Sequence, residues 1–404
     1  MDAKTGARER FDTMRDDMIA LSHRIHAHPE LGFEEEKAVA WLSETLSDAG
    51  FAVETGICDM PTAFIGRVGG GPLHIAICAE YDCLPGIGHA CGHNIIAASA
   101  IGAGIAIAKI ADDVGLTVSV IGTPAEEVGD AGGKILLLER GAFEGVHAAM
   151  MVHPAPMDIV DPSIIACSTF QVHYTGKETH ASAFPERGIN AADALTVAQT
   201  AIGLLRQHIH ATDRIHGIIT KGGDAPNVIP AHTEAQYIVR AKTLGELNDI
   251  RAKVLRCFEA GALATGAQLD IVGGEKPYAE LHSDPDIAAA YQNNAETLGR
   301  TFPDLGPARE RMAGSTDMGN VSLAFPSIHP CIGIDSLPAV NHQPGFTAHC
   351  ITKAADKAIV DGALAMAWTA IDLATNTPVR DRLMKKPDQE LPAKVSRDLQ
   401  RKTT

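Results

Sequence analysis

Four short stretches of the chain carry side chains that can bind metal ions or transfer protons. Cys91 and His93 are separated by a single glycine, Glu126 and Glu127 are adjacent, and His153 and His342 stand alone. Thiolate, imidazole and carboxylate groups are the ligands that zinc takes in proteins. Two thiol or carboxylate ligands together with three imidazoles are more than the three or four ligands that one zinc ion takes. The set therefore favours two metal ions about 3.5–4 Å apart.

The segments before these residues predict how they come together. Apolar, strand-like runs lead into three of the four stretches, at Leu73–Ala79, Leu116–Ile121 and Ala148–Val152. In open α/β sheets, loops at the carboxyl ends of the strands meet along one edge and form the site. The surrounding sequence is uncharged, so a carboxylate buried there needs a compensating cation, and a metal ion would supply it.

Each group taken alone has an ordinary structural explanation. Cys91 can be a small buried apolar residue, which is a common fate of free cysteine. Two adjacent glutamates usually lie in a solvated loop, and a histidine at a strand end is usually just hydrogen-bonded. Convergence of all four stretches on one sheet edge is what favours a metal centre over these explanations.

The order of elements predicts two kinds of architecture in one chain. Helices at Met18–Ala27, Glu36–Ala49 and Ile95–Ile110 alternate with apolar strands, which is typical of an α/β domain with a central sheet. From Ser168 to Val272 the pattern becomes β-α-β-β-α-β, the ferredoxin-like order, with its third strand expected at His232–Ala241. An α/β pattern then resumes, with a strand expected at Ile328–Ile334, and ends in a long Ala-rich helix at Thr352–Leu373. The expected catalytic domain consists of residues 1–167 and 278–376, and the inserted domain of residues 168–277. Residues 377–404 are expected to form a charged, solvated C-terminal arm.

Composition narrows the class of protein. The chain has 404 residues, 45% of them hydrophobic, and a formal net charge of −16. That charge disfavours nucleic acid and anionic membranes as partners. No apolar signal segment follows Met1, and the apolar run at Ile95–Ala108 is too short to span a bilayer. Eight scattered cysteines do not form a disulfide framework, so we expect reduced thiols and a cytoplasmic protein.

A set of motifs resembles one group of enzymes. They are Ala79-Glu80-Tyr81-Asp82, His89-Ala90-Cys91-Gly92-His93, Pro124-Ala125-Glu126-Glu127, Thr179-His180-Ala181-Ser182, Gly188-Ile189-Asn190-Ala191-Ala192 and Asn227-Val228-Ile229-Pro230. The set is similar to the dinuclear metallohydrolases that include aminoacylases, glutamate carboxypeptidases and indole-acetyl-amino-acid hydrolases. Within them it most resembles the Cys-containing amidohydrolase branch, with its aminoacylase-1-like dipeptidases and aminobenzoyl-glutamate hydrolase subunits. The resemblance extends from about Met18 to Leu373.

This resemblance implies a fold and a set of roles. The fold is a metallopeptidase-type catalytic domain with a mixed central sheet, interrupted by a lid domain that also forms a homodimer. The implied metal ligands are Cys91, His93, Glu127, His153 and His342. Glu126 would be the general base, Asp82 a further catalytic residue, and His180 the oxyanion donor, reaching the site of the neighbouring subunit. Asn227 and Arg240 would hold a substrate carboxylate.

Three positions depart from the pattern of the relatives. Asn94 replaces an aspartate, Gly314-Ser315-Thr316-Asp317-Met318 replaces a Gly-Ser-Glu-Asp-Phe loop, and Glu80 lies where other branches carry a metal-binding histidine. The expected chemistry is therefore better defined than the substrate pocket.

The sequence predicts a metal-dependent amidohydrolase acting on an N-acyl amino acid or a dipeptide-like amide, with Glu126 as base for a metal-activated water. A thiolate ligand favours zinc, with manganese or cobalt as alternatives. A hydrolase with Cys91 as nucleophile and His93 as base is one rival, but two residues apart on a tight loop is a poor geometry. A non-catalytic binding module is the other rival, and it would have to lack the base that Glu126 provides.

Overall fold

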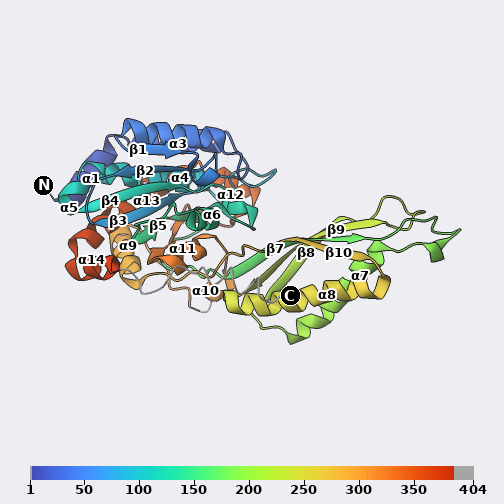
Figure 1. The fold of residues 1–404 in the computed structure, drawn as a ribbon. Coiled ribbons are helices and arrows are strands. Elements are labelled where there is room, and N and C mark those ends of the chain that lie inside the picture. The colour runs from blue at the N-terminus through green and yellow to red at the C-terminus, as the bar shows by residue number, and fades with distance from the viewer. Residues whose placement is uncertain (1, 307, 386–404) are drawn as a thin grey trace.

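The computed structural model describes residues 2–306 and 308–385. It has two lobes, a larger one that contains the N-terminus and a smaller, elongated one that projects from it (Figure 1). The smaller lobe consists of residues from the middle of the chain, so the larger lobe is built from segments on either side of it.

The larger lobe is built on a six-stranded mixed sheet, in the order β1-β2-β4-β3-β5-β11. Its strands are β1 (Ala52–Thr55), β2 (Phe64–Val68), β3 (Leu73–Ala79), β4 (Leu116–Gly122), β5 (Ala148–Met150) and β11 (Ser327–Ile328). β3 runs parallel to β4 and β5, whereas β2 is antiparallel to both β1 and β4. The predicted mixed central sheet is confirmed. Beside it, β6 (His153–Ala155) pairs with β12 (Cys331–Gly333) in a separate two-stranded sheet.

Helices cover both faces of the central sheet, which explains the nearly continuous apolar sequence of β3. Ile75 and Ile77 pack into the core on one face, and Ala76 and Cys78 into the core on the other. The first face is covered by α1 (Ala3–Asp12), α2 (Arg15–His26), α3 (Glu36–Asp48), α4 (His93–Ala108), α9 (Pro285–Thr297) and α13 (Lys353–Thr375). The second is covered by α6 (Gly133–Glu139) and α11 (Met318–Ala324). Short helices complete the lobe: α5 (Ala111–Val114), α10 (Ala308–Arg311), α12 (Pro344–His349) and α14 (Thr377–Met384).

The smaller lobe has the predicted β-α-β-β-α-β order. Its elements are β7 (Ala166–Thr175), α7 (Ala191–Leu205), β8 (Arg214–Lys221), β9 (His232–Ala241), α8 (Leu244–Thr265) and β10 (Gln268–Gly273). The strands form an antiparallel sheet in the order β10-β7-β9-β8. Its own apolar core includes Phe170, Tyr174, Leu195, Val254 and Phe258, from the strands and both helices.

Helix α13 is long and apolar enough, by length and composition alone, to cross a membrane. In the fold, 83% of the most apolar 18-residue stretch of this helix is buried inside the protein. It packs against α4 and α9, so its composition is that of a central core helix.

Two predicted strands are broken in the structure. The strand expected at Ala148–Val152 ends at Met150, and β6 begins after it at His153. The strand expected at Ile328–Ile334 is split into β11 and β12 around His329 and Pro330, where the missing amide of proline prevents continuous pairing. Helix α1 was not predicted, because its sequence is largely polar.

The prediction of a solvated C-terminal arm from residue 377 is wrong for its first turns. Thr377–Met384 forms helix α14, capped by the Asn376 side chain. Leu383 is buried in the core of the larger lobe, and Arg382 forms ion pairs with Asp284 and Asp286. The charged composition of this segment hid a helix whose Leu383 is buried in the core, with Val379 and Met384 packed against the same core. Residues 386–404 of the predicted arm lie outside the described residues.

We predict that Leu383→Ala lowers stability by about 2–5 kcal/mol, because it removes buried methyl groups and leaves a cavity. A thermal unfolding scan should show a melting temperature lower by several degrees. Arg380→Ala is the matched control, since the Arg380 side chain on the same helix bonds to its exposed neighbour Asp381. Equal melting temperatures for the two variants would contradict the docking of α14.

Candidate active site

The loop after β3 brings Cys91 and His93 to the carboxyl edge of the sheet, where His93 is the first residue of α4. Between them, Gly92 has φ 74°, in the left-handed region that glycine tolerates. A Cβ at Gly92 would lie 2.5 Å from Cγ of Pro154, the residue after His153. Glycine therefore permits the loop of Cys91 and His93 to pass directly against the strand of His153.

Asp82 orients two of the predicted metal ligands. One carboxylate oxygen lies 2.8 Å from Nδ1 of His93, and the other accepts the backbone N–H of Glu127 at 2.9 Å. With Nδ1 engaged in this way, His93 directs Nε2 toward the centre of the site. A carboxylate behind a histidine ligand is the usual arrangement in metal centres, where it fixes the tautomer and the ring orientation.

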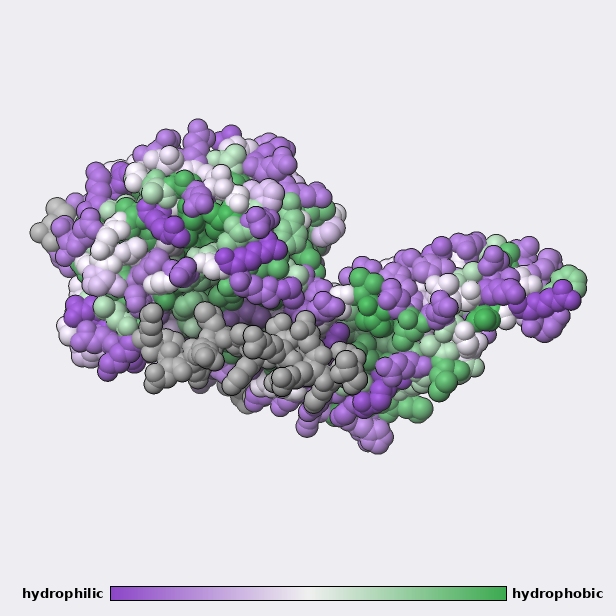
Figure 2. Space-filling model, viewed as in Figure 1, coloured by the Kyte–Doolittle hydropathy of each residue, from purple (hydrophilic) through white to green (hydrophobic). Residues whose placement is uncertain are grey.

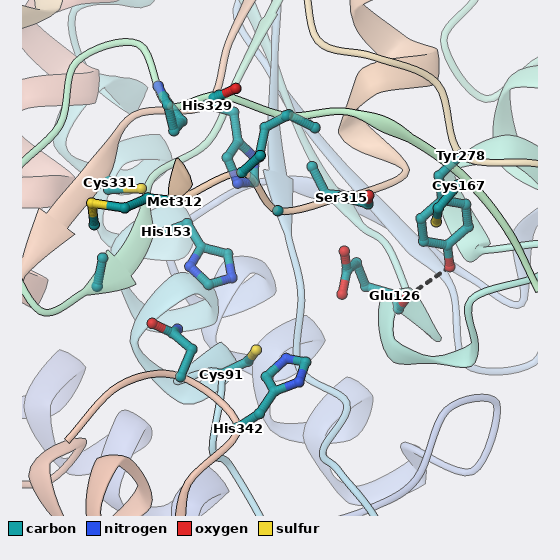
Figure 3. Close-up of a pocket in the computed structure, with 18 of the residues that line it drawn as sticks. Cys91, Glu126, His153, Cys167, Tyr278, Met312, Ser315, His329, Cys331 and His342 are labelled. Carbon is teal, nitrogen blue, oxygen red and sulfur yellow. Dashed lines mark hydrogen bonds between the residues drawn. The ribbon is translucent and has the colours of Figure 1, made fainter. Parts of the chain in front are cut away.

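All five predicted ligands converge in two overlapping groups. Cys91, His93 and His153 form one, and Cys91, Glu127 and His342 form the other; within each group the potential ligand atoms all lie within 4.8 Å of one another. Cys91 belongs to both groups, so its thiol lies between two adjacent positions for a metal ion. Figure 3 shows Cys91, His153, His342 and Glu126 around the same space, on segments that are far apart in sequence.

The backbone around these residues is held in uncommon conformations. Ala125, before the two glutamates, has φ 60°, and His342 has φ 67°. Positive φ in residues other than glycine is unfavourable and tends to occur at functional sites. The backbone N–H of His342 donates to the carbonyl of Ala90 at 2.9 Å, and that of Ala125 donates to the buried carboxylate of Glu35 at 2.8 Å. The first bond holds the loop of His342 against the loop of Cys91, and the second holds the loop of the two glutamates against the start of α3.

Buried polar atoms without partners mark the centre of the site. Nε2 of His93, Oε1 of Glu127 and Oε2 of Glu80 are buried and form no hydrogen bond within the part of the chain that the structure describes. Such orphaned atoms are rare, because each loses its hydration without a replacement. A thiol, imidazoles and a carboxylate with free atoms directed at one place fit divalent metal ions of the zinc type.

The pKa shifts of the buried groups also favour a metal site. Burial, followed by repulsion from Glu80 and Glu127, raises the pKa of Glu126 well above its ordinary value. Burial and the adjacent glutamates likewise raise the pKa of the Cys91 thiol. A cysteine nucleophile needs the opposite shift, so the rival in which Cys91 attacks the substrate is disfavoured. The site concentrates negative charge that added cations would stabilise.

Lys134 is a central residue that the sequence interpretation missed. It is fully buried on α6, and its Nζ lies 2.5 Å from both Glu80 and Asp317. The expectation that a metal ion supplies the cation for the buried carboxylates is therefore incomplete, because Lys134 compensates these two. Its position in the apolar run Gly-Gly-Lys-Ile-Leu-Leu-Leu was the available signal. Glu80 is in turn 3.4 Å from Nε2 of His93, so the ion pairs directly adjoin the predicted ligands.

A pocket of about 490 Å³ opens beside the ligands. Apolar side chains, among them Leu84, Ile159, Ile164 and Met312, line part of it. The hydroxyl of Tyr278 donates to the backbone carbonyl of Glu126 at 2.6 Å and fixes that residue at the pocket wall (Figure 3). His329, which the sequence interpretation also missed, lies in the pocket wall with its ring 5.4 Å from that of His153.

The three predicted residues of the inserted domain fall in two places. Arg240, on β9, lines the pocket and donates to the hydroxyl of Ser315 at 2.7 Å. His180 and Asn227 are exposed and do not line it. They lie together instead, since the backbone N–H of Ala181 donates to the carbonyl of Asn227 and His180 forms a β-bridge with Val228.

Comparison with known proteins agrees with this geometry. Residues 76–358 match the model of Peptidase family M20/M25/M40. The chain is 39% identical over 387 residues to a mouse Xaa-Arg dipeptidase, covering 92% of this chain and 88% of the relative. It is 34% identical over 266 residues to one of the subunits of the p-aminobenzoyl-glutamate hydrolase of Escherichia coli, covering 61% of this chain and 55% of that protein.

Solved structures share the fold. A putative aminohydrolase from methicillin-resistant Staphylococcus aureus superposes with a TM-score of 0.72 at 22% identity, covering 91% of this chain and 99% of that one. A dinuclear metal-binding peptidase from Bacillus subtilis superposes with a TM-score of 0.65 at 21% identity, covering 90% and 99%. The resemblance found in the motifs is confirmed: the chain belongs to Peptidase family M20/M25/M40 and is an amide-bond hydrolase.

Proposed function

We propose that the protein is a metal-dependent amidohydrolase that cleaves a dipeptide-like or N-acyl amino acid amide bond, with Glu126 as general base. The observation that carries the proposal is the pair of ligand groups sharing Cys91, with Glu126 beside them at the pocket wall. The mouse and E. coli relatives are named for hydrolysis of a dipeptide and of an aminobenzoyl-glutamate, which are both amides of amino acids.

Two divalent ions, zinc by preference and manganese or cobalt as alternatives, fit the five ligands Cys91, His93, Glu127, His153 and His342. The Bacillus subtilis peptidase of the same fold is described as dinuclear, which supports two ions here. When bound, such ions polarise an amide carbonyl and make a water molecule more acidic.

Glu126 is placed to move the proton. Its side chain is 4.0 Å from Nε2 of His93 at the centre of the site, and burial together with neighbouring carboxylates raises its pKa, so it holds a proton readily. In the proposed reaction, Glu126 takes one proton from the attacking water and gives it to the leaving nitrogen as the C–N bond breaks. Asp82 acts as a positioning residue, because it holds both His93 and the backbone of Glu127.

We assign Arg240 to binding a substrate carboxylate. Its guanidinium faces the pocket and is steadied by Ser315, and a guanidinium matches the geometry of a carboxylate. Asn227 would assist from the same position as His180.

His180 would serve the site of a second protomer. Strand β7 begins at the pocket, where Cys167 and Thr169 line it, and it ends at Thr175. Ten strand residues extend about 30 Å, so the segment with His180 starts far from its own pocket. A homodimer would place it at the partner's pocket.

The edge of the smaller lobe supports such a dimer. β8 is an edge strand, and its Ile218 and Ile219 are 63% and 50% exposed. Leu204 on α7 is 72% exposed. Hydrophobic residues are visible on the surface of the smaller lobe in Figure 2. An unpaired strand edge flanked by exposed apolar residues is suited to an isologous two-fold contact.

We further propose that residues 168–277 act as the lid and dimerisation domain, between catalytic segments 1–167 and 278–376. A cytoplasmic location is proposed because all eight cysteines, which lie within the described residues, are free in the fold.

The metal proposal predicts two divalent ions per chain in the active protein, measured by elemental analysis. Removal with a chelator should abolish hydrolysis, and adding back zinc, manganese or cobalt should restore it. Cys91→Ser should lower the metal content without changing the circular dichroism spectrum, because the thiol is shared between the two ligand groups. Full activity in protein that contains no metal would refute the proposal.

The two adjacent glutamates should separate in their effects. Glu126→Gln should lower turnover by at least about a hundredfold while metal content is unchanged, because only the proton carrier is lost. Glu127→Gln should lose metal as well. The measurements are initial rates on a panel of dipeptides and N-acyl amino acids, with elemental analysis of the same samples. If Glu127→Gln keeps its metal and Glu126→Gln loses it, the two roles are reversed.

A mixture of two inactive variants tests the shared site. His180→Ala lacks the oxyanion donor and Glu126→Ala lacks the base, so each homodimer should be nearly inactive. Unfolding and refolding the two together makes about half of the dimers hybrid, each with one intact site, so about a quarter of wild-type activity should return. Wild type refolded in parallel is the control. If it recovers and the mixture does not, His180 serves its own protomer.

A further inference from the structure

A second cluster of metal-type ligands lies on the smaller lobe, outside the pocket. Helices α7 and α8 pack on one face of its sheet, against Phe170, Val172 and Tyr174. Successive residues of a strand point to opposite faces, so His173 of β7 lies on the face that these helices do not cover. His232 and Glu234 of β9 lie on that same face, and both are partly exposed.

The strand register brings these three side chains together. His173 is paired directly with Glu234 across β7 and β9, and His232 is two residues before Glu234 on the same face. Nε2 of His232 lies 2.7 Å from Oε1 of Glu234, and Nδ1 of His173 lies 3.9 Å from the same oxygen. The imidazole rings are stacked, with centroids 5.9 Å apart and planes inclined by 22°.

We propose that His173, His232 and Glu234 form an accessory site for a divalent transition-metal ion of the zinc class. One ligand atom from each residue lies within 4.8 Å of the other two. Two imidazoles and one carboxylate are a common zinc set that leaves a position for water. The side chains are 22%, 33% and 38% exposed, so an ion and its water can enter from solvent.

The sheet makes this a preformed site. Backbone pairing along β7 and β9 fixes the three Cα positions, so binding requires only rotation of side chains about their terminal torsions. The carboxylate already draws both histidines toward it, and its own pKa is lowered, first by the hydrogen bond from His232. The site shares no residue with the catalytic ligands, so it would hold an ion independently of them.

An ion there would also link β7 to β9, close to the end of β7 and the start of β9. Thr175 ends β7 and His232 begins β9, and the backbone N–H of Gly176 donates to the carbonyl of Ala231 just beyond. Residues 176–190, which include His180, follow β7 at this point, and residues 222–231, which include Asn227, lead into β9. The accessory ion would therefore brace the base of these two stretches.

Metal counting tests the proposal without relying on hydrolysis. Metal-free protein is equilibrated with zinc, passed through a desalting column and analysed for zinc per chain. Wild type should hold one more ion than His232→Ala or His173→Ala. Gln236→Ala is the matched control, since Gln236 is the next residue of β9 on the same face, and it should hold as many ions as wild type.

The Glu234→Gln variant shows whether loss of the ion can be separated from loss of folding. The amide keeps an oxygen for the bond to His232 but lacks the charge that an ion requires, so this variant should keep the wild-type circular dichroism spectrum and lose the same one ion. Equal zinc content in wild type and all three site variants would overturn the proposal and leave a hydrogen-bonded trio. The result is a difference in zinc content between proteins with the same catalytic ligands. The test therefore gives an answer regardless of whether the catalytic centre binds two ions, one or none.

Discussion

The structure of the site depends on burying many carboxylates at one edge of the central sheet. Glu80, Asp82, Glu126 and Asp317 are all buried there, and unpaired charges are costly to remove from water. The fold compensates the charge of these buried carboxylates in two ways. Lys134 forms buried ion pairs with Glu80 and Asp317 behind the site. In front, free ligand atoms of His93 and Glu127 face a space suited to divalent cations. Ion pairs of this kind contribute little net stability, but removing either partner would leave a buried charge uncompensated.

The fold serves this arrangement by ending its strands in loops of limited freedom. β3 and β4 are largely apolar on both faces, and the polar residues that form the site follow their carboxyl ends. Left-handed backbone at Ala125 and Gly92 turns the chain sharply at these ends. The carboxylate of Asp82 then joins the two loops, since one oxygen meets His93 and the other meets the amide of Glu127. A single aspartate thereby sets the relative position of two candidate ligands that follow different strands.

The sequence allowed much of this to be predicted, for physical reasons that differ between elements. β3 and β9 were predicted to the residue, because their apolar pattern is bounded by glycine, proline or a change of periodicity. The five candidate ligands were singled out because a metal set needs several residue types that seldom coincide; the structure brings them together, and their role as ligands stays a prediction. Lys134 was missed because a lone lysine in a helix is normally solvated, and its burial depends on two acids 54 and 183 residues away. Helix α14 was missed because its docking rests on tertiary contacts of Leu383 and Arg382.

The sheet of the smaller lobe reaches from the pocket to the part of the lobe that carries His180 and Asn227. Ile238 and Arg240 of β9 line the pocket at one end, while β9 begins at the other, next to the segment with His180 and Asn227. Because antiparallel pairing makes this sheet one rigid body, any rotation of the lobe moves Arg240 and the distal segment together. In a dimer joined at the β8 edge, that rotation would act on the chain's own pocket through Arg240 and on the partner's pocket through His180. Closure of the two sites would then be coupled by rotation of one rigid sheet, without a chain of conformational changes from residue to residue.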